Sequence, residues 1–82
     1  MNDVRRRRLR EIKTQIDFVN SQLKDASKRL SSILSEEQDA FDNMPESLQS
    51  SYRGMCSEDA IDDMEEASEK LDEVIELLGD IV

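Results

Sequence analysis

Acidic side chains dominate the last third of the chain and are the first candidates for chemistry. Between residues 57 and 80 they recur three or four positions apart, which places them on one broad face of a helix. Carboxylates on helices can hold magnesium, and EEASE at residues 65–69 offers one suitably spaced pair. A second pair at matching spacing is missing, so we expect no metal site. We call this set the acidic face: Asp59, Asp62, Glu65, Glu66, Glu69, Asp72, Glu73 and Glu76.

The sequence lacks histidine and has a single cysteine, Cys56. Histidine is the commonest general base and the commonest ligand of transition metals. A lone cysteine cannot form an internal disulfide, which leaves a reduced thiol or a bridge between two chains. We therefore expect a protein that is not an enzyme, with no catalytic residue and no cofactor.

Three roles of the acidic face remain open. An ordinary exposed helix face mixes lysine with acidic residues, whereas like charges four residues apart repel by a few tenths of a kcal/mol per pair. Solubility of an oligomer is the simplest reason to tolerate this repulsion. The face could instead bind a basic protein or the arginine-rich end of a second subunit. It could also imitate nucleic acid, because carboxylates about 5 to 6 Å apart along a helix approach the phosphate spacing of one strand.

The opposite end of the chain is basic. Residues 1–30 carry nine lysines and arginines against four acidic residues, whereas residues 31–82 carry two against sixteen. We call Arg5, Arg6, Arg7 and Arg8 the basic cluster. The dipole at a helix start disfavours positive charge by some tenths of a kcal/mol each, so we expect anionic neighbours from a second subunit, a phosphate backbone or an acidic protein. Nucleic acid is not favoured, because interleaved aromatic residues and a recognition-helix motif are missing.

Helices must position these charged sets. With 38% charged residues, two glycines and one proline, the composition is typical of an all-α protein. Apolar residues spaced three and four apart predict a first helix over about residues 3–43, capped by Asn2 or Asp3. A second helix is predicted over about residues 57–79, capped by Ser57. Heptad positions a and d of the first helix form the predicted oligomer seam: Leu9, Ile12, Ile16, Val19, Leu23, Leu30 and Ile33.

Residues 44–56 are predicted to be the hinge between the helices. Pro45 cannot continue the helical hydrogen-bond ladder and pushes the residue before it out of helical geometry. We expect one short turn after Pro45, with Leu48 packed against the helix ends and Gly54 closing the turn. Tyr52 is the only tyrosine and is our first choice for a recognition role in this hinge.

The lengths of the two helices predict association of chains within one single-domain protein, residues 1–82. If the second helix folds back with Ser57 beside Met44, about 16 residues of the first helix remain uncovered, a length of about 24 Å. Near the hinge the e positions are apolar as well, which suits a bundle of three or more helices. Towards the N-terminus the e positions are polar, as at Asn20, which leaves a narrow a/d seam. We therefore expect a homodimer of antiparallel helical hairpins, joined in a four-helix bundle or another coiled-coil oligomer.

Two stretches resemble a known group of proteins: EEQDAFDNMPESLQSS at residues 36–51 and EDAIDDMEEASEKLDEVIELL at residues 58–78. The likeness is to short, mostly uncharacterised acidic helical-hairpin proteins of bacteriophages and bacteria, in which an F-D-N-x-P-E-x-L-Q-type hinge joins two acidic helices. The resemblance covers about residues 30–80 and implies a compact helical hairpin of phage origin. It implies no named activity.

Together these features predict a small non-enzymatic interaction module that binds itself and another protein. For a phage-encoded protein, the expected role is inhibition of a host protein, such as one of a defence system, through the acidic face. The alternatives are nucleic-acid association through the basic cluster and a purely structural assembly subunit. The sequence has no run of 18 apolar residues and no secretion signal, so we expect a cytoplasmic location and no membrane partner.

Overall fold

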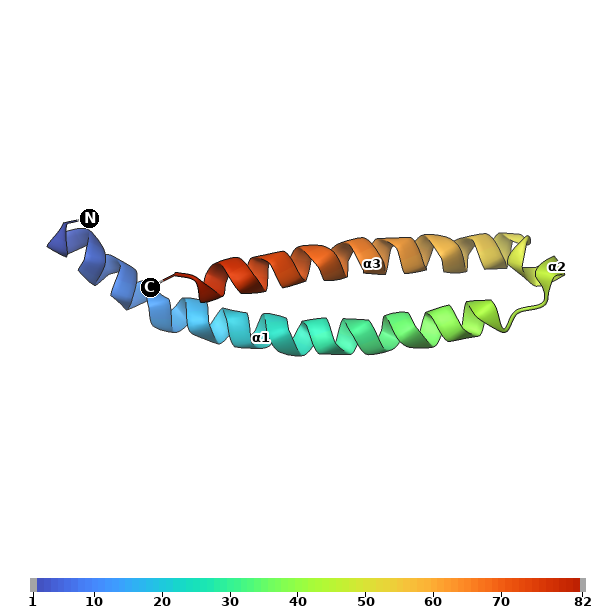
Figure 1. The fold of residues 1–82 in the computed structure, drawn as a ribbon, viewed down its shortest axis with the longest axis horizontal. Coiled ribbons are helices and arrows are strands. Elements are labelled where there is room, and N and C mark those ends of the chain that lie inside the picture. The colour runs from blue at the N-terminus through green and yellow to red at the C-terminus, as the bar shows by residue number, and fades with distance from the viewer. Residues whose placement is uncertain (1, 82) are drawn as a thin grey trace.

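The computed structural model describes residues 2–81. It contains three helices in order: α1 (Asp3–Asp42), α2 (Glu46–Gln49) and α3 (Tyr52–Gly79). The all-α prediction is confirmed, because the described residues form helices and no strand. In Figure 1, α3 runs back beside α1, and α2 lies in the connection between them. The outermost residues of the predicted domain, Met1 and Val82, lie outside the described part.

Local signals set both ends of α1. Asn2 is the N-cap, and its side-chain Oδ1 accepts a hydrogen bond from the backbone N–H of Arg5 at 2.9 Å. The helix ends at Asp42, within one residue of the predicted end, and Asn43 caps it. Pro45 follows with φ −57°, and its carbonyl accepts the first backbone hydrogen bonds of α2. Between residues 2 and 81, no helix combines the length and the apolar character that membrane crossing requires.

α3 begins at Tyr52, five residues before the predicted start at Ser57. Ser51 is its N-cap, and the Ser51 hydroxyl accepts a hydrogen bond from the backbone N–H of Gly54 at 3.3 Å. The predicted role of Gly54 is wrong, because this glycine lies buried in the first turn of α3 and does not adopt a positive φ. A Cβ at this position would lie 2.6 Å from the carbonyl carbon of Gln49. Gly54 therefore allows α3 to approach the backbone of α2.

The other predicted hinge residues are largely exposed. Leu48 keeps 49% of its surface exposed, so it does not pack against the helix ends in the single chain as predicted. Tyr52 is 82% exposed at the first position of α3. Gln49 holds the connection to α1, because its side-chain amide donates a hydrogen bond to the carbonyl of Phe41 at 2.9 Å.

α1 and α3 face each other through heptad positions a and e, not a and d. The less exposed residues of α1 recur at 9, 13, 16, 20, 23, 27, 30 and 34, and those of α3 at 57, 61, 64, 68, 71, 75 and 78. Three long-range side-chain hydrogen bonds join described residues of α1 to α3. Asn20 Nδ2 donates to the Ile75 carbonyl at 3.3 Å, and Ser27 donates to Asp72 at 3.0 Å. Ser57 donates to Glu37 at 2.5 Å. The polar e positions that the sequence analysis placed away from the partner helix therefore lie against it.

The N-terminal turns of α1 extend past the end of α3 (Figure 1). Because residue numbers run in opposite directions along the two helices, the Asn20–Ile75 contact sets Ile81 level with about residue 14. About ten residues of α1, from its start to about residue 13, remain uncovered over a length of about 15 Å. We call this segment the overhang. The predicted overhang is too long, because Ser57 lies beside Glu37 and not beside Met44. The early start of α3 moves the whole helix by about two turns along α1.

The contact between the two helices buries little apolar surface. Ile61, at 5% exposure, is the only buried hydrophobic residue in the described part of the chain. The accessible surface is 6598 Å², whereas a compact protein of 9.5 kDa exposes about 5,000 Å². The radius of gyration is 18.9 Å, against about 12 Å for a compact domain of this length. A single chain therefore leaves an unusually large surface in water.

Replacing Gly54 tests the close approach of α2 and α3. We expect Gly54→Ala to lower the free energy of unfolding by about 1 to 3 kcal/mol, because the new methyl group meets backbone carbonyl groups of α2 that cannot move as a side chain would. Urea denaturation followed by circular dichroism measures this change. Gly79→Ala is the matched control, since a Cβ there meets nothing within 4 Å, and we expect no loss of stability. Equal stability of Gly54→Ala and the unmodified protein would contradict this account.

Candidate interaction surfaces

The d positions of both helices lie on one side of the α1–α3 pair. When antiparallel helices meet through a and e, their d rows turn to the same side and their b rows to the other. Two hollows near the hinge bear this out. The first, on the d side, is lined by Glu37, Ala40, Met44, Arg53, Cys56, Ser57, Ala60 and Met64. The second, on the b side, is lined by Gln38, Phe41, Glu58, Ile61, Asp62 and Glu65.

The d side is apolar along most of its length, and we call it the apolar face. Its members are Ile12, Val19, Ala26, Ile33 and Ala40 from α1, with Ala60, Ala67 and Val74 from α3. The larger side chains remain open to solvent: Ile12 is 49% exposed, Ile33 53% and Val74 43%. An aligned row of exposed aliphatic side chains, continuous over two helices, is typical of an interface and not of a solvated surface.

The predicted oligomer seam divides between two environments. Its a positions, Leu9, Ile16, Leu23 and Leu30, are half-buried, and the last three lie along the contact with α3. Its d positions, Ile12, Val19 and Ile33, lie exposed on the apolar face. The sequence pattern identified the apolar rows but did not separate the row that α3 covers from the row that it leaves open.

Asn20 interrupts the contact between the helices. It is 8% exposed, and its single recorded hydrogen bond runs from Nδ2 to the Ile75 carbonyl. The other polar atom, Oδ1, is buried and has no hydrogen-bond partner. An unsatisfied buried polar atom destabilises a fold by about 1 to 3 kcal/mol. Asn20 is therefore a weak point of the α1–α3 contact, whereas its polar e position was predicted to lie outside a narrow a/d seam.

The acidic face lies on the exposed side of α3, and only Asp72 among its members accepts a hydrogen bond from α1, donated by Ser27. All eight of its members are exposed, from Asp59 near the hinge to Glu76 near the end of α3. Among the described residues, ion pairs occur only within α1, between Lys13 and Asp17 at 3.2 Å and between Arg29 and Asp25 at 3.1 Å. The acidic face therefore has no cationic partner in the described chain. Residues 2–81 also contain no group of three or more histidine, cysteine or acidic side chains that could hold a metal ion.

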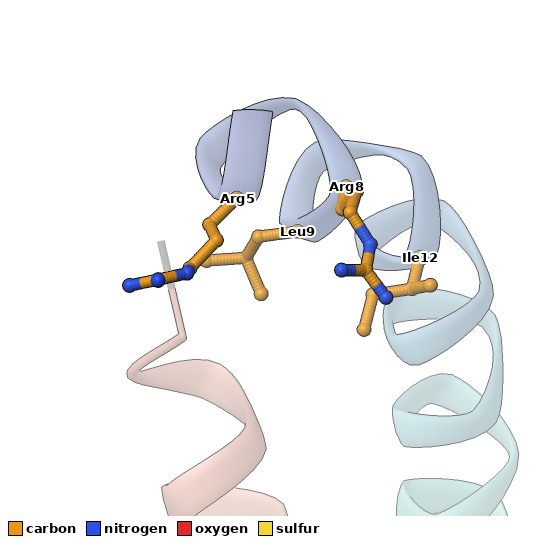
Figure 2. Close-up of a pocket in the computed structure, with 4 residues that line it drawn as sticks. All are labelled: Arg5, Arg8, Leu9 and Ile12. Carbon is orange, nitrogen blue, oxygen red and sulfur yellow. The ribbon is translucent and has the colours of Figure 1, made fainter. Parts of the chain in front are cut away.

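The basic cluster lies on the overhang of α1. All four arginines are exposed, and none takes part in an ion pair with a described side chain. A hollow is lined by Arg5, Arg8, Leu9 and Ile12 (Figure 2). Figure 2 shows Arg5 beside Leu9 and Arg8 beside Ile12, beyond the end of α3. The anionic neighbours expected for these arginines are therefore not supplied by the chain's own helices.

Comparison with known proteins yields no relative: no family model, no curated protein and no solved structure matches the chain. The interpretation of these surfaces therefore depends on their geometry and charge.

Filling the Asn20 site tests its role as a weak point. We expect Asn20→Leu to raise the free energy of unfolding by about 1 kcal/mol, because it removes a buried oxygen without a partner and adds apolar contact with α3. Thermal denaturation at fixed protein concentration measures the change. Ser21→Leu, at the exposed neighbouring position, is the control and should alter stability by less than about 0.5 kcal/mol. A lower melting temperature for Asn20→Leu would contradict this interpretation.

Proposed function

We propose that the protein is a non-enzymatic interaction module that pairs with itself. In this proposal α1 and α3 form a helical hairpin, and two hairpins pack their apolar faces together as a four-helix bundle. The acidic faces then lie on the outside of the bundle, where they bind a basic protein. The observation that carries the proposal is the row of exposed aliphatic side chains along one side of the α1–α3 pair.

The surface of the single chain supports self-association. It exceeds the surface of a compact protein of this mass by about 1,500 Å². A stable protein interface buries about 800 Å² on each partner. The excess is therefore large enough for one complete interface, and a second copy can use the same residues in return because a two-fold interface is self-complementary.

The width of the apolar surface favours a bundle of four helices. Positions a, d and e are apolar around the hinge, for instance at Met44, Ala40 and Phe41, and two helices can cover only two of these rows. In a four-helix bundle each helix contacts two neighbours, so the third row is covered as well. The small residues Ala26, Ala40, Ala60 and Ala67 in the d rows would let the two layers approach closely.

A basic protein is the partner we propose for the acidic face. Its carboxylates are exposed, form no ion pair with a described cation although Lys70 lies beside Glu69, and follow one side of α3 for most of its length. Such a surface attracts positively charged proteins and speeds their association. A phage origin, as the resemblance implies, makes a host protein the partner to test first. Nucleic-acid association through the basic cluster gains no independent support, because exposed arginines alone do not select a partner.

A charge on the apolar face tests the self-association. We expect Ile33→Asp to raise the dissociation constant of the dimer about 100-fold, because about 1.5 kcal/mol of apolar burial is lost in each of two copies. Sedimentation equilibrium at micromolar concentrations measures this constant. Ser32→Asp adds the same charge one position away, on the exposed outer side of α1, and should leave the mass unchanged. A monomeric unmodified protein would overturn the proposal.

Neutralising part of the acidic face tests its partner role. We expect Glu66→Gln, Glu69→Gln and Glu73→Gln together to weaken capture of basic proteins from a host lysate at least tenfold, as measured by quantitative mass spectrometry. The dimer mass should be unchanged, and the melting temperature should rise, because like charges four residues apart no longer repel each other.

The control removes the same amount of negative charge from α1, at Glu11→Gln, Asp17→Asn and Asp25→Asn. It should retain the captured proteins. Equal loss in both variants would show that net charge alone determines binding, and unchanged capture by the α3 variant would leave the acidic face with only a solubilising role.

A further inference from the structure

We propose that the two copies associate head to tail, with the overhang of each copy docked in the hinge-end hollow on the apolar face of the other. This inference rests on the proposed self-association and adds the orientation and the contact residues. It assigns a role to both ends of α1, the basic N-terminal end and the acidic hinge end. Neither end forms an ion pair with another described helix.

The overhang presents both apolar and positive groups. Between residues 2 and 13 it carries six arginines and lysines against two acidic residues. Leu9 and Ile12 line one hollow together with Arg5 and Arg8 (Figure 2), and Ile12 belongs to the apolar face. A partner segment that covers the overhang must therefore supply both apolar contact and negative charge.

The hinge end of the second copy supplies both. Residues 36–53 contain five acidic side chains against one arginine, Arg53, so this end carries a net charge of −4. The hollow on the d side of this end has a volume of about 460 Å³. Ala40, Met44, Ala60 and Met64 supply its apolar lining, and Glu37 and Arg53 are its charged members. Small alanines leave space for incoming side chains, and flexible methionines can adapt to their shape.

A parallel arrangement, in which the α1 helices of the two copies point in the same direction, would bring like charges together. With the two-fold axis along the helices, both overhangs would project from the same end, and the two basic clusters would become neighbours. Such a juxtaposition of like charges opposes association. With the axis perpendicular to the helices, each basic cluster lies near the acidic hinge end of its partner. The same favourable contact then forms twice, because the symmetry repeats it.

Cys56 gives a direct test, because it lines the hinge-end hollow and is the only cysteine. Mild oxidation with oxidised glutathione should convert most of an Ile12→Cys variant to a disulfide-linked dimer, in which each new cysteine is joined to Cys56 of the other copy. Peptide mapping identifies the bond. Within one chain the two sites are about 26 residues apart along α1, or about 39 Å, so an internal bond cannot form.

Two matched variants keep the test decisive. Arg8→Cys lies on the same hollow and should also link to Cys56, even if the loss of Ile12 weakens the dimer. Arg7→Cys lies at the same height on the opposite side of α1 and should give less than one tenth of the linked product. A Cys56–Cys56 bond in the unmodified protein would overturn the head-to-tail orientation, because that orientation places the two Cys56 side chains at opposite ends.

Charge reversal provides a second measurement on the full chain. Arg5→Glu with Arg8→Glu should raise the dissociation constant of the dimer at least tenfold, and adding Glu36→Arg and Asp39→Arg should restore most of the affinity. A dimer of normal affinity that neither forms the Ile12 and Arg8 cross-links nor responds to the reversal would overturn this inference and leave self-association intact. A monomeric unmodified protein would overturn both.

Discussion

The structure depends on one constraint: around the hinge each long helix has three apolar heptad rows, and contact with one other helix can cover only two of them. α1 and α3 meet through two heptad rows, and the third row remains in water on the apolar face. Because Ile61 is the only buried hydrophobic residue among residues 2–81, the isolated chain has almost no hydrophobic core. The extended shape, the excess surface and the proposed pairing of two chains all follow from this constraint.

The distribution of charge complements this apolar pattern. Apart from Asp72, which accepts a hydrogen bond from Ser27, the members of the acidic face lie at positions that neither α1 nor the apolar face uses. They therefore remain available after two chains have paired. The opposite charges on the two ends of α1 are too far apart to meet within one chain. They can meet only between chains, and this relation links the orientation of the proposed dimer to the order of residues along one helix.

Local signals made much of the fold predictable. Asn2 and Pro45 mark the limits of α1, and the spacing of apolar residues identified both long helices. The start of α3 could not be read in the same way, because Ser51 and Ser57 are both suitable caps. In the structure Ser51 is the N-cap, and its hydroxyl accepts a hydrogen bond from the backbone N–H of Gly54. The choice between the d and e rows failed for a related reason. A polar residue such as Asn20 suggests an exposed position, whereas the tertiary contact buries it.

The contact between α1 and α3 is better buried and better hydrogen-bonded near the hinge than at its other end. This difference determines where the two helices separate first. Near the hinge, buried Ser57 and Ile61 and the hydrogen bond to Glu37 fasten α3 firmly. Towards its other end, the contact includes the incompletely satisfied Asn20 and ends beside the free overhang. Separation of the helices should therefore start at the C-terminal turns of α3 and progress towards the hinge. A ligand that binds between α1 and the C-terminal turns of α3 would therefore need less free energy to separate the helices than a ligand that binds between them near the hinge.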